Sequence, residues 1–184
     1  MTLSPSPGRL IHETARLRLR ELTSDDAAFI MELVNEPAWL RFIGDRNVHS
    51  LEDARGYIER GPVASYAKHG FGLWVVELRG TPAAGGHGEP AGMCGLIRRE
   101  SLPHVDLGFA FLARHRGHGY AREAAAATVA LAHERYGLER LLAITDPDNT
   151  ASRAVLEHAG FTFERTFVWS ENGKEQALYA KDLT

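Results

Sequence analysis

Two glycines one residue apart, Gly117 and Gly119, constrain this chain more than any other short feature. They stand between an apolar run, Val105–Leu112, and a long alanine-rich pattern, Gly119–Tyr136. The run is typical of a buried strand, and the pattern is typical of a helix packed closely on a sheet. Glycines at such a junction let several backbone N–H groups point one way, at the positive end of the following helix. The segment therefore predicts an anion site, and the pyrophosphate of a nucleotide-like cofactor is the anion we expect.

Three interpretations of this loop are open from its own residues. A dinucleotide-binding loop would carry a third glycine at the position of Arg122, and the strands before it here form an antiparallel meander. A phosphate-binding loop of nucleotidases would need Gly-Lys followed by Ser or Thr, which this sequence lacks. The third interpretation is a glycine-rich turn that joins strand to helix and binds nothing.

Hydrophobic periodicity predicts one mixed α/β domain. Short apolar or alternating runs predict seven strands, over residues 17–22, 71–78, 91–99, 105–112, 140–145, 163–169 and 175–179. Helical spacing with polar caps predicts four helices, over residues 25–35, 50–60, 119–136 and 149–159. We expect the first helix to stop at Pro37, because the residue before a proline disfavours helix, and a loop with Trp39 and Phe42 to follow.

Length and composition fit a single soluble domain. The chain has 184 residues and 44% hydrophobic content, enough for one full core. We expect residues 1–13 to be a flexible lead-in and residues 14–184 to be the domain. The net charge of −3 argues against nucleic acid as a partner, and no apolar stretch is long enough to span a membrane. The start of the chain lacks the apolar core of a signal peptide, which predicts a cytoplasmic protein.

Two local features have ordinary structural interpretations. Arg16, Arg18 and Arg20 form one local basic spot, and Arg98 and Arg99 form another; alternating arginines on a strand favour a solvated strand face over a binding patch. Cys94, the only cysteine, lies in a small-residue run that predicts a buried strand, so we do not expect a catalytic thiol or a disulfide within the chain.

A second motif follows the strand predicted at 140–145. It reads Asp146-Pro147-Asp148-Asn149-Thr150-Ala151-Ser152-Arg153-Ala154-Val155-Leu156-Glu157-His158-Ala159-Gly160-Phe161. With Asp106-Leu107-Gly108-Phe109 and the loop Arg114-His115-Arg116-Gly117-His118-Gly119-Tyr120-Ala121, it resembles the GCN5-related N-acetyltransferases (GNAT). The segment Glu13–Arg20 is similar to the opening strand of the branch that acetylates ribosomal-protein N-termini (RimJ/RimL type). The resemblance runs from about Thr14 to Lys181, with three separated motifs in the right order.

The resemblance implies the GNAT fold and acetyl-CoA as its co-substrate. The fold is a central mixed, mostly antiparallel sheet of about seven strands with four flanking helices, splayed between strands four and five. Acetyl-CoA would lie in that splay, with its pyrophosphate on N–H groups of residues 116–121 and its pantetheine arm along residues 111–113. The implied contacts are Phe111, Leu112, Ala113, Arg116, Gly117, His118, Gly119, Tyr120, Ala121, Asn149 and Ser152. Asn149 would hold a pantetheine amide; its alternative is a plain helix cap, and both roles are compatible.

Acetyl transfer to an amine needs a neutral amine, a polarised thioester carbonyl and a proton for the leaving thiolate. A backbone N–H near Phe111 would polarise the carbonyl. Asp106 stands where this branch often has a glutamate, so it is the first candidate to take the amine proton, directly or through water. The alternative for Asp106 is a solvated acid at a strand edge. Glu100 and His104 are the next candidates, and Glu171 is a weaker one.

One difference from the family pattern predicts which group assists the leaving sulfur. Many GNAT members use a tyrosine as general acid four residues after the position of Ser152, and this chain has Leu156 there. Ser152 is therefore the candidate to bond the departing sulfur. Its alternative is a cap for the helix at 149–159.

These observations predict an N-acetyltransferase that moves the acetyl group of acetyl-CoA to a primary amine by direct attack in a ternary complex. The amine belongs either to a protein N-terminus or to a small molecule, and the residues do not distinguish them. The alternative is a catalytically silent GNAT-fold domain that binds CoA as a sensor or scaffold. His104, His115 and His118 lie close in sequence without a zinc-binding pattern, so we expect no metal. The oligomeric state is not predicted.

Overall fold

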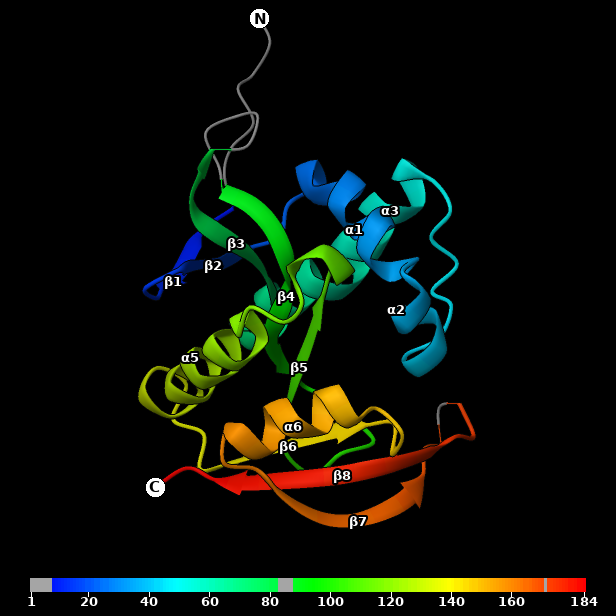
Figure 1. The fold of residues 1–184 in the computed structure, drawn as a ribbon, viewed down its shortest axis with the longest axis vertical. Helices are drawn as coiled ribbons and strands as arrows, with labels where there is room; N and C mark the ends of the chain where they lie inside the picture. The colour runs from blue at the N-terminus through cyan, green and yellow to red at the C-terminus, as the bar shows by residue number, and fades with distance from the viewer. Residues whose placement is uncertain (1–7, 83–87, 171) are drawn as a thin grey trace, which may run out of the picture.

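One eight-stranded sheet organises the part of the chain that the structure describes (Figure 1). This computed structural model describes residues 8–82, 88–170 and 172–184. The strands lie in the order β1-β2-β3-β4-β5-β6-β8-β7. Their bounds are β1 Leu10–Glu13, β2 Leu17–Glu21, β3 Leu73–Pro82, β4 Gly88–Ile97, β5 Asp106–Phe111, β6 Arg140–Thr145, β7 Thr162–Val168 and β8 Glu175–Asp182.

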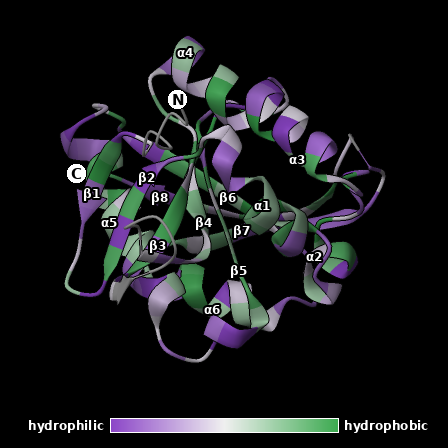
Figure 2. Cartoon of the chain, turned by 90° about the horizontal axis from the view of Figure 1, so that it is seen from above, coloured by the Kyte–Doolittle hydropathy of each residue, from purple (hydrophilic) through white to green (hydrophobic). Residues whose placement is uncertain are grey.

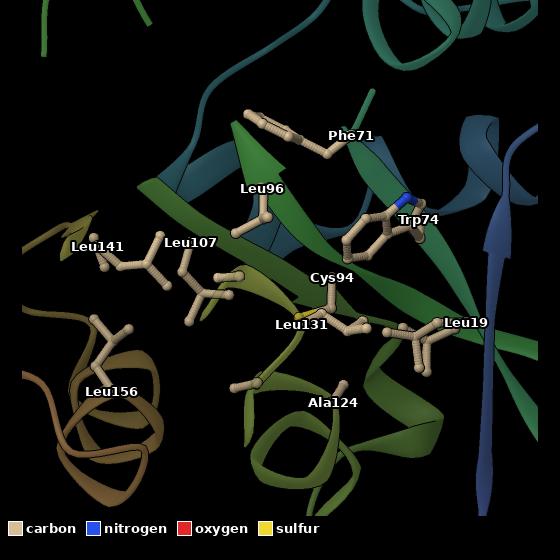
Figure 3. Packing of buried hydrophobic residues seen from close by; sticks show 14 of the residues in the cluster. Leu19, Phe71, Trp74, Cys94, Leu96, Leu107, Ala124, Leu131, Leu141 and Leu156 are labelled. Carbon is tan, nitrogen blue, oxygen red and sulfur yellow. The ribbon is translucent and has the colours of Figure 1, made fainter. Parts of the chain in front are cut away.

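Helices cover both faces of this sheet. Their bounds are α1 Ala27–Val34, α2 Pro37–Phe42, α3 Leu51–Ile58, α4 Ala64–His69, α5 Tyr120–Glu134 and α6 Thr150–His158. The helices α5 and α6 contribute Ala124 and Leu156 to one apolar cluster, whose packing against Cys94 and Leu107 can be followed in Figure 3. On the other face, α1, α2 and α3 form a second cluster with Met93 and other strand residues. Hydrophilic residues are frequent along α3, which lies at the edge of the molecule (Figure 2).

The sheet opens between β5 and β6. These two strands run parallel and pair at a single position within the described residues, Asp106 opposite Leu142. The Leu142 N–H donates to the Val105 carbonyl at 3.0 Å, and beyond this point the strands diverge (Figure 1). By contrast, β6 pairs with β8 along its whole length, residues 140–145. The predicted mixed α/β fold and the splay between the fourth and fifth predicted strands are both confirmed.

The number of strands corrects the prediction at the start of the chain. Residues 10–13 form β1 and pair with β2, with Leu10 opposite Arg20. The expectation that residues 1–13 are a flexible lead-in is therefore wrong for residues 10–13. Ile11 is buried against the main core, but a four-residue strand is too short to stand out as a pattern in the sequence.

The helices also depart from the prediction. Pro37 begins α2 instead of a loop, because proline is tolerated at the first helical position, where the missing N–H has no partner in the helix. The helix predicted to end near residue 60 continues through a π-helical turn, Glu59–Val63, into α4. This wider turn contains Pro62, which lacks the N–H that a regular helix would use. No helix among the described residues is both long and apolar enough to cross a membrane.

Candidate active site

Two cavities lie on either side of the splay between β5 and β6. The first, about 510 Å³, includes Phe111, Gly117, Gly119 and Tyr120 in its lining, and we call it the glycine-loop cavity. The second, about 490 Å³, is the inner chamber, and its lining includes Tyr57, Arg99, Asp106, Thr145 and Gln176. Both are lined by Trp39, Phe42, Ile43, Phe109, Ala110, Asn149 and Ser152. The splay therefore forms one passage from the glycine loop to the chamber.

The glycine loop presents unpaired donors at the start of α5. Gly117 and Gly119 have φ angles of +78° and +80°, a left-handed conformation that strongly favours glycine. None of the N–H groups from Gly117 to Arg122 donates to another group in the described chain. A Cβ atom added at Gly117 would meet nothing within 4 Å, so the loop faces open space. This geometry suits an anion, as predicted from the two glycines.

Arg116 does not belong to this set of donors. Its N–H donates to the Ala113 carbonyl at 3.2 Å. Its guanidinium donates to the Phe111 carbonyl at 2.8 and 3.0 Å and to Glu36 at 3.0 Å. The prediction that the Arg116 N–H holds a phosphate is therefore not supported, because that N–H closes the preceding turn.

The free edge of β5 includes only one of the three residues predicted for it. The Leu112 N–H donates to the Ala91 carbonyl of β4 at 2.9 Å. Because an antiparallel strand alternates which side its backbone groups face, Phe109 and Phe111 turn theirs away from β4 and toward β6. The Ala113 N–H is held by Glu36 at 2.9 Å. Leu112 and Ala113 thus have their N–H groups engaged, contrary to the prediction, while Phe111, also predicted, keeps its N–H at the open edge.

Arg16 supports the glycine loop, although its position on an alternating strand predicted a solvated side chain. It donates to the His118 carbonyl at 2.8 Å and to Glu123 at 2.7 Å, and its guanidinium lies 4.8 Å from the centre of the Tyr120 ring. Thr14 also donates to Glu123, at 2.5 Å. Burial alone would raise the pKa of Glu123, but the hydrogen bonds from Thr14 and Arg16 lower it overall. Arg20 was also predicted to be solvated, but it is buried between Asp26 and Glu77.

Asn149 and Ser152 stand together where the two cavities meet. The Asn149 side-chain oxygen accepts the Ser152 N–H at 3.1 Å, so the cap interpretation of Asn149 is confirmed. Its amide nitrogen and the Ser152 hydroxyl have no hydrogen-bond partner within the described chain, and both residues line the passage. Because Asn149 caps the helix, the alternative of Ser152 as the cap is wrong. Two polar groups therefore remain available to a ligand at the splay.

Asp106 lies on the wall of the inner chamber. It is only 1% exposed and accepts Arg99 Nε at 3.1 and 3.2 Å from its two carboxylate oxygens. The alternative of a solvated acid at a strand edge is therefore wrong, since β5 is central and the carboxylate is enclosed. Its position at the single point where β5 meets β6 places a charge at the base of the splay.

Two other chamber residues refine the prediction. Leu156, at the family's tyrosine position, is buried and contributes only carbon to the chamber wall. Tyr57 of α3, which no motif of the sequence singles out, is a tyrosine that lines the chamber. Burial raises the pKa of Tyr57, against the opposing effect of nearby Arg46 and Arg99. The position of Tyr57 beside the buried Ile58 gave no indication that it lines a cavity.

The other candidates lie elsewhere. Glu100 is exposed beyond β4, and His104 lines a separate cavity with Arg140 and Glu164. Glu171 lies outside the described residues. His115 contacts Glu89 at 3.0 Å, and the His118 ring stacks on Tyr120 with centroids 5.5 Å apart. No group of three side chains suited to a metal gathers within the part of the chain that is described.

The sequence matches the acetyltransferase (GNAT) domain over residues 16–162. The chain belongs to the GNAT acetyltransferase family. It is 30% identical over 158 residues to the uncharacterized protein YkkB of Bacillus subtilis, across 83% of this chain and 86% of that protein. It is also 28% identical over 167 residues to the FsC-acetyl coenzyme A-N(2)-transacetylase of Aspergillus fumigatus, across 91% and 70% respectively.

Solved structures agree with this family. An acetyltransferase from Agrobacterium tumefaciens superposes with a TM-score of 0.76 and 26% identity, over 98% of this chain and 96% of that one. A ribosomal-protein-S5-alanine acetyltransferase from Vibrio fischeri superposes with a TM-score of 0.74 and 19% identity, over 94% and 96%. The predicted likeness to the ribosomal-protein branch therefore extends to the fold.

Proposed function

We propose that this GNAT acetyltransferase moves the acetyl group of acetyl-CoA to a primary amine by direct attack in a ternary complex. The observation that carries the proposal is the passage between β5 and β6. It joins the unpaired N–H groups of the glycine loop to a chamber that holds an enclosed carboxylate, Asp106. The name of the Aspergillus fumigatus relative supports both acetyl coenzyme A as donor and an amine nitrogen as acceptor.

The residues present fit acetyl-CoA. The N–H groups of residues 117–122 bind the pyrophosphate, helped by the positive end of α5. The open edge at Phe109 and Phe111 pairs with the pantetheine arm in the manner of an added strand, and the Asn149 amide nitrogen donates to that arm. Arg116 and Glu36 act indirectly, since they hold the end of β5 in place.

The bound co-substrate supplies a thioester, so the amine nitrogen forms a C–N bond with its carbonyl carbon as the C–S bond breaks. CoA leaves as a thiolate, which becomes the thiol by taking up the proton that the amine has lost. The Phe111 N–H polarises the carbonyl oxygen. Asp106 takes the proton that the amine loses, directly or through water. The Ser152 hydroxyl donates a hydrogen bond to the departing sulfur. Leu156, at the family's tyrosine position, has no donor for it.

Thermal unfolding tests the binding step. Acetyl-CoA at about 100 times its Kd stabilises the folded state by about 2.7 kcal/mol, which raises the melting temperature by about 5–10 °C in a chain of this size. We expect Gly119→Glu to abolish this shift, because it places a carboxylate at the anion site. Gly137→Glu is the control, since Gly137 also has a positive φ but lies beyond the other end of α5. A wild-type protein that shows no shift would exclude the enzyme.

Thiol release tests the chemical step. Purified protein, acetyl-CoA and a panel of peptides and polyamines should release free CoA thiol with at least one amine. Binding of acetyl-CoA without turnover on any amine would instead support the alternative, a silent CoA-binding domain.

A further inference from the structure

A second groove adjoins the inner chamber on the side of α3 and α4. It has a volume of about 570 Å³, and residues of the loop after α2, the π turn and α4 line it. Arg46, Tyr57 and Arg99 line both this groove and the chamber. A molecule that places one end beside Asp106 can therefore extend its remainder along the groove.

The charge of this groove differs from that of the whole chain. Its lining includes the positively charged side chains Arg46, Arg60, Lys68, Arg98 and Arg99. The one acid in the lining is Asp53, whose carboxylate accepts the His49 N–H at 3.1 Å at the start of α3. The chain as a whole carries a net charge of −3. Positive charge is thus concentrated here, and we call this surface the basic groove.

Three of these cations have no partner among the described residues. Arg99 pairs with Asp106, and Arg98 donates to the Pro103 carbonyl at 3.1 Å. Arg46, Arg60 and Lys68 have neither an ion pair nor a hydrogen bond within the described chain, unlike Arg16, Arg114, Arg116 and Arg140. All three are exposed. Like charges gathered around one groove repel each other, and an anionic ligand removes that repulsion.

The arrangement of the three cations indicates an extended ligand. Arg46 lies after α2, Arg60 in the π turn and Lys68 in α4, so the charges are distributed along the groove on three different elements. A π turn is itself a feature that occurs frequently at functional sites. We propose that the amine acceptor carries carboxylate or phosphate groups some distance from its reacting amine, and that Arg46, Arg60 and Lys68 bind those groups. This inference rests on the proposed function and specifies its substrate class.

Matched acceptors test the proposal. Peptides of equal length and identical first residue, with acidic or neutral residues at the following positions, are compared by kcat/KM for thiol release. A peptide with serine at those positions and its phosphoserine counterpart form a second pair, which places phosphate groups some distance from the amine. We expect the anionic member of at least one pair to be preferred about tenfold, with the preference falling at about 0.5 M salt as exposed charges are screened. Equal rates within both pairs would overturn the proposal.

Charge variants locate the effect. Arg60→Gln and Lys68→Gln should each lower the anionic-to-neutral ratio toward one. Arg55→Gln removes the same charge from the neighbouring α3, outside the groove, and should leave the ratio unchanged. The proposal is overturned if the anionic-to-neutral ratio is the same in Arg60→Gln and Lys68→Gln as in the wild-type protein. It is also overturned if Arg55→Gln lowers the ratio as much as they do.

A binding measurement separates this proposal from the proposed function. If no amine is acetylated, the proposed function is wrong. Binding of a labelled acidic peptide, measured by fluorescence anisotropy, then tests the basic groove independently of catalysis. Binding that weakens in Arg60→Gln and not in Arg55→Gln supports the basic groove. No binding by the wild-type protein overturns it.

Discussion

Asp106 combines near-complete burial with a place on a cavity wall. Arg99 holds both of its carboxylate oxygens, which keeps the side chain oriented toward the base of the splay. Ser152 faces the same passage from α6, with its hydroxyl free. The two predicted catalytic side chains therefore approach the splay from opposite sides, one from the sheet and one from a helix.

At the residue scale, Asp106→Asn should lower kcat by about 100-fold, because it keeps the shape of the side chain and removes the proton acceptor. The KM for acetyl-CoA should change little, since Asp106 lies in the inner chamber and not beside the glycine loop. Asp148→Asn is the control, an exposed acid just before α6 that lines neither cavity. Steady-state kinetics of thiol release measure the change. Unchanged kcat in Asp106→Asn would remove this residue from the mechanism.

At the element scale, the turn between β1 and β2 holds the start of α5. Thr14 and Arg16 both bind Glu123, in the first turn of that helix, and Arg16 also holds the glycine loop. A second support comes from Glu36, which joins the start of α2 to the Ala113 N–H and to Arg116. Both sides of the glycine loop are thus tied to segments about 80 to 110 residues away in sequence.

The Glu123 contacts predict a pH dependence. Its pKa is lower in the folded chain than the value of about 4.3 expected when unfolded, so the carboxylate stabilises the fold above that value. The stabilisation is lost as pH falls through the lower, folded pKa. The melting temperature of wild type should exceed that of Glu123→Gln at pH 7, and the difference should vanish well below pH 4. A difference that persists at the lowest pH would contradict this account. Glu134→Gln, exposed in the last turn of α5, is the control.

At the scale of the whole molecule, the core encloses the only cysteine. Cys94 is fully buried between β4 and α5, with its sulfur 3.3 Å from the Thr128 hydroxyl. Burial raises the pKa of this thiol to about 12, so the reactive thiolate is scarce at neutral pH. We expect no reaction with a disulfide reagent in the folded protein and one thiol per chain after unfolding in guanidinium. Rapid reaction of the native protein would show that this part of the core opens easily.

The sequence predicted the elements that carry a strong local pattern. The strand at 140–145 and the cap by Asn149 agree with the structure, and the glycine loop has the backbone angles expected of it. Errors occurred where the pattern was short or ambiguous, as at β1 and α2. Alternation along β2 did not reveal that Arg20 is buried, because the fold brings its partners Asp26 and Glu77 to it from other elements.

The sequence by itself determined the order of the strands and helices that have a strong local pattern, the loop that requires glycine and the motifs that identify the family. These are local properties, set by side-chain periodicity, by allowed backbone angles and by residue spacing along the chain. Only the tertiary structure decided which edge groups of β5 are free, which donors the loop leaves unpaired and how Asp106 comes to face the inner chamber. Those depend on the divergence of β5 from β6 and on helices packed against both faces of the sheet. Such contacts join residues far apart in sequence, and no local pattern encodes them.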